Sequence, residues 1–209
     1  MKKAIVALVT SMLLGLAPAV GAQTPDIKTC FVSAPDSLLP HLGVNSRKDL
    51  LDLQAAGQES RVTGRLGQSV SLVSLDERTL TLSLTEISTL QIALLPAKSG
   101  AVVAVIHTIG LPAADSRVRF YDTQWRPLDG SALFTPPQAQ DFLSGSKKAK
   151  AAAARMLPLL PVAYEIEGDV LRATQHIQEY LPREVGEEIA PQLLTAPLVY
   201  RWNGKRFVR

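Results

Sequence analysis

The chain has 209 residues, of which 46% are hydrophobic, 20% charged and 5% aromatic, and this composition excludes disordered, collagen-like and coiled-coil proteins. The formal net charge is +3. Two of the 22 basic residues, Lys2 and Lys3, lie in a segment that we expect to be removed, which leaves 20 basic against 19 acidic residues. A charge so close to balance argues against a nucleic-acid partner.

The N-terminal segment has the pattern of a secretory signal. Two lysines precede an apolar run over residues 4–16, and the small residues of 20–22 follow. We predict a signal peptide over residues 1–22, cleaved after Ala22. The alternative is an uncleaved anchor, but a helix of this apolar run reaches about 20 Å, short of the roughly 30 Å hydrocarbon core. The sequence therefore predicts a periplasmic or secreted protein without a membrane span after cleavage.

The single cysteine, Cys30, excludes an intramolecular disulfide, so stability has to come from a hydrophobic core. A lone thiol in an oxidising compartment is either buried or available for a bond between two chains, and burial is the usual case.

The first half of the chain combines two helical segments with a run of strands. Leucine spacing predicts a helical turn or two over residues 36–42 and a helix that begins at Asn45 or Ser46 and stops at Gly57. The period then changes to two, with hydroxyl and leucine side chains on opposite faces. This pattern predicts antiparallel strands around 70–72, 79–84, 90–94, 101–106 and 118–120, joined by short connections as a meander.

The second half repeats this order in outline. We predict a helix over 135–143, a helix capped by Ser146, a hairpin of 162–167 with 170–174, and a weakly helical stretch over 176–194. The clearest hairpin spans 198–208, where Asn203 and Gly204 favour a type I′ turn.

These elements predict an α+β fold with an antiparallel sheet, or two similar sheets side by side, and helix pairs packed on one face. We expect one compact domain over residues 23–209. The order of elements is that of two tandem helix-helix-meander repeats, over 31–130 and 135–209, although the sequence echo between them is too short to prove a duplication.

His107, Asp115 and Ser116 are the residue types of a nucleophilic triad, but their order and spacing match no known nucleophile elbow, and no Gly-x-Ser-x-Gly sequence occurs. His107 shares a strand face with Val103 and Val105, so we expect a hydrogen-bonded core histidine. The three residues remain weak catalytic candidates.

The candidate binding residues are an acid, a base and three aromatics: Asp115, Arg117, Tyr121, Trp125 and Trp202. Exposed on one surface, the first four would grip a peptide or a glycan. The structural alternative is that Asp115 and Ser116 cap a turn by bonding their own backbone, with Arg117 paired to Asp115 or Asp122. Trp202 lies on the terminal hairpin, where an aromatic more often packs on the core.

We expect neither a metal nor a cofactor. The three histidines are widely separated and lack metal-site spacing. Glu165, Glu167 and Asp169 alternate along one strand and could gather calcium, but a solvated strand edge explains them better. The basic segment over 147–155 has no interleaved aromatics, which favours a solvated surface helix over a nucleic-acid or lipid site.

Across nearly the whole mature chain, the sequence resembles a family of secreted, uncharacterised proteins from Bacteroidales, the domain of unknown function 3256. The resemblance rests on the following segments and residues: 35–40, Arg47, 49–52, 94–96, His107, Thr108, 115–117, 120–122, Trp125, Pro127, Leu128 and 200–205. The family is associated with no established activity, so the resemblance implies compartment and architecture.

These observations favour a non-enzymatic protein that binds another protein or an envelope component through a sheet face or concavity. The alternatives are a hydrolase with an unrecognised site near His107, Asp115 and Ser116, or an inhibitor of a secreted enzyme. The oligomeric state does not follow from the sequence.

Overall fold

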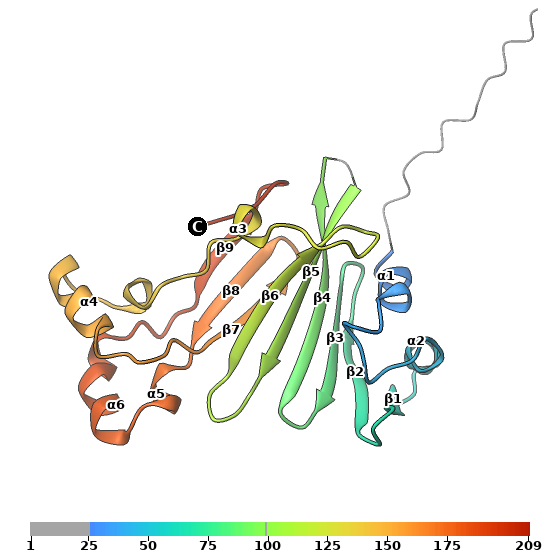
Figure 1. Cartoon of the computed structure of the whole chain (residues 1–209), viewed down its shortest axis with the longest axis horizontal. Coiled ribbons are helices and arrows are strands. Elements are labelled where there is room, and N and C mark those ends of the chain that lie inside the picture. Colours follow the sequence, from blue (N-terminus) through green and yellow to red (C-terminus); the bar gives the residue numbers. More distant parts are fainter. Residues whose placement is uncertain (1–25, 99) are drawn as a thin grey trace, which may run out of the picture.

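The computed structural model describes residues 26–98 and 100–209, and Figure 1 labels its elements. The predicted signal peptide lies outside the described residues. The described part is an α+β structure with two antiparallel sheets, of six and four strands. Within this part, no helix has the length and apolar character needed to cross a membrane.

Two helices precede the first sheet, α1 over Ile27–Ser33 and α2 over Val44–Ala55. The start of α1 is capped by Asp26, whose carboxylate accepts a hydrogen bond from the N–H of Thr29 at 3.3 Å. The predicted helical turn over 36–42 is a single turn, in which the N–H of Leu39 bonds the carbonyl of Pro35 at 3.2 Å, and the helix α1 before it was not predicted. The helix lies upstream because Ile27, Cys30 and Phe31 recur at helical spacing and are buried.

A buried arginine joins the two helices. Arg47 is fully buried on α2, and its Nε donates to the carbonyl of Leu42 at 3.1 Å. Its Nη1 donates to the carbonyls of Val32, at 3.1 Å, and Ala34, and its Nη2 pairs with Asp36 at 2.8 Å. The acceptors and the carboxylate make a buried charge tolerable. The N-cap of α2 is Gly43, not the predicted Asn45 or Ser46.

The thiol of Cys30 is free and buried on α1. Burial, and secondarily the carboxylate of Asp26, raises the pKa of this thiol to about 11. The group is therefore protonated and unreactive at neutral pH.

The first sheet is a meander in which each strand pairs with the next along the chain. Its strands are β1 (Arg61–Thr63), β2 (Ser69–Leu75), β3 (Thr79–Thr85), β4 (Ser88–Ala97), β5 (Gly100–Ile109) and β6 (Asp115–Tyr121). Period-two alternation divides the side chains between two faces. We call the face of Leu82, Leu90 and Val105 the helix face, because it packs against α1 and α2, and the face of Gln91 and Ile106 the junction face.

The second sheet has the order β10-β9-β8-β7. Its strands are β7 (Val162–Glu167), β8 (Val170–Gln175), β9 (Leu198–Trp202) and β10 (Phe207–Val208). Three short helical elements lead to it, α3 (Gly130–Leu133), η1 (Ala139–Phe142) and α4 (Lys147–Ala154), and three more lie between β8 and β9, α5 (Ile177–Tyr180), α6 (Arg183–Ile189) and η2 (Ala190–Gln192). Figure 1 shows the second sheet beside the first, with α4, α5 and α6 at the end of the molecule farthest from α1 and α2.

Three clusters of buried side chains stabilise the described residues. One lies between α1, α2 and the helix face, and the second joins the junction face to the second sheet. The third, smaller cluster gathers Leu143, Ala153, Ile177, Ile189 and Leu193 from the helical end. Helices therefore pack on one face of the first sheet, as predicted, while the second sheet covers the other face.

Two predicted elements of the second half differ from the structure. The helix expected over 135–143 is only the single turn η1, preceded by α3. In the last hairpin Gly204 has a φ of 85° but Asn203 has no positive φ, so the turn is not type I′. Instead, the side-chain oxygen of Asn203 accepts from the N–H groups of Lys205 and Arg206, which closes a longer loop.

Candidate functional site

The second sheet is joined to the first through the outer edge of β7. The N–H groups of Val162, Tyr164 and Ile166 alternate along β7 and point away from β8. They bond side-chain oxygens of the first sheet: Asp115 at 3.2 Å, Ser116 at 3.0 Å and Gln91 at 2.8 Å, respectively. Side chains thus satisfy the backbone of this edge where a neighbouring strand normally would. We call this set of contacts the β7 clamp.

Gln91 makes the most complete contact of the β7 clamp. Its Oε1 accepts from the N–H of Ile166 at 2.8 Å, while its Nε2 donates to the carbonyl of the same residue at 3.1 Å. The side-chain amide therefore imitates a paired strand residue. Ile166 is 2% exposed, so both backbone groups depend on this partner.

The hydroxyl of Ser116 lies between two further partners. It accepts from the N–H of Tyr164 and lies 2.7 Å from the hydroxyl of Thr108. Because the backbone N–H uses the serine as an acceptor, the serine proton is free to donate to Thr108.

A cavity of about 1100 Å³ follows β6 beside the β7 clamp. Its volume lies slightly above the usual range of ligand pockets, about 300–1,000 Å³. It extends around β6 from the helix face to the loop between β6 and β7. The wall on the helix face includes Leu38, His41, Leu90, Val105 and Ile109, and the opposite wall includes Phe134, Pro136, Pro137, Leu160 and Tyr164.

The outer edge of β6 opens into this cavity. The carbonyl of Phe120 accepts from the N–H of Leu128 at 2.9 Å, so Phe120 directs its backbone groups away from β5. Backbone direction alternates along a strand, and Val118 and Ser116 therefore direct their N–H and C=O groups the same way. No backbone partner for these groups lies in the described part of the chain.

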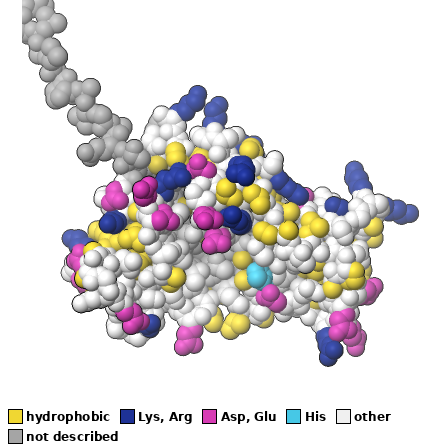
Figure 2. Space-filling view, turned by 180° about the vertical axis from the view of Figure 1, so that it is seen from behind, with side chains coloured by type: hydrophobic (Ala, Val, Ile, Leu, Met, Phe, Trp, Pro, Cys, Tyr) yellow, Lys and Arg dark blue, Asp and Glu magenta, His cyan; other side chains and the backbone are white. Residues whose placement is uncertain are grey.

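The helix face of β5 and β6 carries unpaired positive charge. His107 lies opposite Arg117, and Arg119 lies opposite Val105. Within residues 26–98 and 100–209, neither guanidinium has a carboxylate oxygen within 4.0 Å. On the face drawn in Figure 2, basic and acidic side chains are interspersed over the left and centre, while basic side chains alone project at the upper right.

His107 titrates in this positive environment. Partial burial, followed by the charges of Arg119 and Arg117, lowers the pKa of His107 below its ordinary value of 6.5. The imidazole is therefore neutral at pH 7. Our expectation of a hydrogen-bonded core histidine is wrong, because His107 is exposed: α1 and α2 pack on β2 and β4 and do not extend over this end of β5.

The chain matches the family model "Protein of unknown function (DUF3256)" over residues 19–207. The chain belongs to this family. Among solved structures, this DUF3256 protein is similar to a domain of an uncharacterized protein from Porphyromonas gingivalis W83, a member of the Bacteroidales, with 28% sequence identity and a TM-score of 0.76. That match covers 88% of this chain and 96% of the other. No curated protein matches the chain.

His107, Asp115 and Ser116 all line the cavity, but the DUF3256 fold holds His107 and Ser116 on opposite faces of the sheet. Ser116 lies opposite Thr108 on the junction face, whereas His107 lies opposite Arg117 on the helix face. Asp115 and Ser116 are both engaged by the N–H groups of β7. They do not cap a turn with their own backbone as the structural alternative supposed, and Asp122 pairs with Arg126 instead of Arg117.

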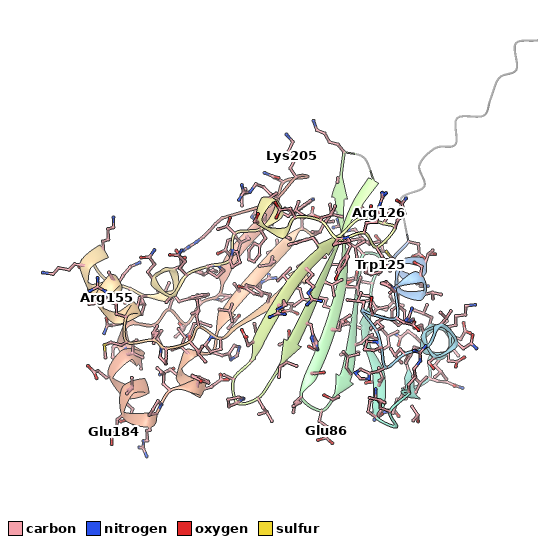
Figure 3. The ribbon with its side chains drawn as sticks, viewed as in Figure 1. Glu86, Trp125, Arg126, Arg155, Glu184 and Lys205 are labelled. Carbon is pink, nitrogen blue, oxygen red and sulfur yellow. The ribbon has the colours of Figure 1, made fainter. Side chains whose placement is uncertain are left out.

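The candidate binding residues occupy three separate places in this DUF3256 protein. Asp115 and Arg117 line the cavity. Tyr121 and Trp125 pack against each other with ring centroids 5.6 Å apart, and Nε1 of Trp125 donates to the hydroxyl of Ser33 on α1 at 3.3 Å (Figure 3). Trp202 is buried in the second core, where its Nε1 donates to the carbonyl of Pro96 at 2.6 Å.

The acidic run that could have gathered calcium pairs with arginines. Glu167 pairs with Arg172 at 2.9 Å, and Asp169 pairs with Arg78 at 2.8 Å, which links the two sheets. In the described part of the chain, no group of three or more His, Cys, Asp and Glu side chains could hold a metal ion.

Sequence reasoning missed Gln91, Arg119 and the outward backbone of Val118. Gln91 carried a weak signal, as a single amide in the otherwise apolar run of 90–95. Period-two alternation places Arg119 on the strand face of Arg117, but nothing in the sequence marks it as part of a site. The open edge had no signal, because it depends on which strand ends the sheet.

Proposed function

We propose that this DUF3256 protein is an exported, non-enzymatic binding protein that holds a partner protein or an envelope component in the cavity along β6. The observation that carries this proposal is the coincidence of three features in one place: a cavity of about 1100 Å³, an unpaired strand edge and two unpaired arginines. Exposed backbone groups and charges of this kind are the usual means of partner recognition.

A binding role also agrees with the occupied state of the serine. The hydroxyl of Ser116 contacts Thr108 and Tyr164, and His107 lies on the other face of the strand. A nucleophile requires a base within hydrogen-bond reach, and these two side chains do not meet. The geometry thus supports binding over hydrolysis at these residues.

Export is supported by the signal pattern of residues 1–22. Fractionation of the producing cell, with N-terminal sequencing of the recovered protein, tests it. We expect the mature chain to begin at Gln23 and to be found outside the cytoplasm. Recovery of a cytoplasmic chain that begins at Met1 would overturn this part of the proposal.

Site-directed photocrosslinking tests the cavity. Ser37→Cys places a thiol at the cavity wall without removing either arginine, and Val199→Cys places one on β9, exposed and outside the cavity. Both variants can be labelled with a benzophenone maleimide, and the native Cys30 should not compete because it is buried. Each labelled protein is then irradiated with an envelope extract of the source organism.

We expect a discrete adduct from the Ser37→Cys protein that is missing from the Val199→Cys protein. The adduct should decrease when unlabelled wild-type protein is added as a competitor. Equal labelling from both positions, or no adduct from Ser37→Cys, would refute binding in the cavity.

A further inference from the structure

We propose that the cavity takes an extended segment of a partner protein, which adds to β6 as a seventh strand and carries carboxylates at alternate positions. This inference rests on the proposed function and specifies its partner. Three observations carry it: the direction of the β6 backbone, the charge on one side of the strand and the apolar wall on the other.

The backbone of β6 offers a strand-length template. Ser116 and Val118 direct N–H and C=O groups into the cavity, and the N–H of Phe120 points the same way. At about 3.4 Å per residue, residues 116–120 span roughly 14 Å, enough for a short added strand. A helix or a sugar chain would not match this alternating row of donors and acceptors, whereas an extended backbone does.

The charge on the helix face specifies the alternate side chains of the segment. Residues opposite Arg117 and Arg119 would form non-hydrogen-bonded pairs with β6, in which cross-strand side chains lie closest. Both guanidiniums lack a carboxylate partner within the described residues, and each presents donors that suit a carboxylate. The segment therefore carries Asp or Glu at two positions separated by one residue.

The intervening residue of the segment faces the other wall. A residue opposite Val118 would project on the side of the junction face, where Phe134, Leu160 and Tyr164 line the cavity. These side chains are apolar or aromatic, and Phe134 packs edge-on against Tyr164 with ring centroids 5.5 Å apart. The predicted pattern of the segment is thus acid, apolar, acid.

A second, smaller hollow continues the cavity beyond Asp115. It has a volume of about 280 Å³ and shares Ile109, Asp115 and Leu160 with the larger cavity. Its wall includes Leu111, Leu159 and Tyr180, which are 63%, 53% and 41% exposed. Exposed apolar side chains gathered at one end of a groove favour an apolar anchor on the segment, next to its acidic positions.

Fluorescence anisotropy with a labelled synthetic peptide tests the inference. The probe alternates glutamate and valine and ends in a leucine. One comparison peptide has lysine in place of glutamate, and the other has the same composition as the probe but with the glutamates adjacent. We expect the alternating acidic probe to bind and neither comparison peptide to bind. Arg117→Glu combined with Arg119→Glu should weaken it by at least about tenfold, the effect of losing one strong contact. Arg201→Glu, an exposed arginine outside the cavity, is the matched control and should leave binding unchanged.

Backbone methylation separates strand addition from simple charge attraction. The N–H groups of the valines would face β6, and those of the glutamates would face away. We expect N-methylation of the valines to abolish binding and N-methylation of the glutamates to preserve it. The doubly reversed variant should in turn bind the lysine peptide, which also shows that the variant is folded.

The outcomes distinguish this inference from the proposed function. Equal binding of both methylated peptides, or no binding of the acidic probe, overturns strand addition. Binding of an acidic oligosaccharide in place of the peptide, with the same loss on reversal of the two arginines, overturns the peptide class. In both cases a crosslink from the Ser37→Cys protein would leave the binding function standing, while failure of that crosslink removes both.

Discussion

The outer edges of β6 and β7 lie close together, but only the backbone of β7 is hydrogen-bonded to side chains of the other sheet. Along β7 every second N–H, from Val162 to Ile166, bonds a side chain of the first sheet. Along β6 the outward groups of Ser116 and Val118 face a cavity. Side chains of the first sheet therefore satisfy the outer edge of β7 but not that of β6. This difference indicates that the open edge of β6 is functional.

The remaining two sheet edges support this reading. β1 has three residues and β10 has two, and such short edge strands resist pairing with other chains. β6 has seven residues, long enough to be an aggregation risk if it were freely exposed. The walls formed by the 130–137 segment and by the loop around His41 narrow the approach, so the edge admits a slender segment more readily than another folded sheet.

Replacing the clamp amide should have the largest effect on stability. Gln91→Leu leaves the N–H and C=O of Ile166 buried without partners, and each such group costs about 1–3 kcal/mol. We expect urea denaturation to show a loss of about 2–6 kcal/mol in the free energy of unfolding. Gln58→Leu, at an exposed position, is the control. A loss no greater than that of the control would mean that β7 is not held by this side chain.

A pair of proline substitutions compares backbone direction within β6. The N–H of Val118 points outward, so Val118→Pro removes a group that no ladder bond uses, whereas Arg119→Pro removes a bond to β5. We expect Arg119→Pro to be the less stable variant by about 1–3 kcal/mol in urea denaturation. The Val118→Pro protein should remain folded but should no longer bind the alternating acidic peptide. If the order of stabilities is reversed, Val118 does not face the cavity as an open donor.

Much of this architecture is predictable from local sequence. The alternation of hydroxyls and leucines over 79–84 locates β3, and the uniformly apolar run of 101–106 places β5 inside the sheet. Both patterns are visible because the burial of a strand is recorded in consecutive residues. The helix over Ile27–Ser33 could also have been predicted, because its buried residues have helical spacing. Its β-branched valine and threonine, however, favour an extended backbone.

The site is less accessible to such reasoning. The contact of Gln91 with Ile166 spans 75 positions of sequence, and no local pattern encodes it. The exposure of His107 depends on where α1 and α2 stop covering the helix face, although its alternation with Val103 and Val105 was identified correctly. Edges and cavities arise from how elements meet, so their residues become visible only in the folded chain.

The smallest expected effect concerns His107, on the charged side of the open edge. Its folded pKa lies below 6.5, so the folded state binds a proton less readily than the unfolded state. The contribution of this group to stability is complete above pH 6.5 and decreases as pH falls toward the folded pKa. Chemical denaturation should therefore show a shallower decline in unfolding free energy below this pH for His107→Gln than for the wild type.

Ligand binding should reverse the sign of this proton effect. A carboxylate placed opposite Arg117 offsets the positive charge of that arginine, which lies beside His107 across the β5–β6 pair and lowers its pKa, so the bound ligand favours the imidazolium. Affinity for the alternating acidic peptide should then rise between about pH 7.5 and about pH 5.5, where the glutamates of the peptide stay ionised. His107→Gln should abolish that rise, and His41→Gln, at the other histidine of the cavity, should preserve it. A rise that depends on His41 alone would place the carboxylates beside the 38–41 segment of the cavity wall and not along β6.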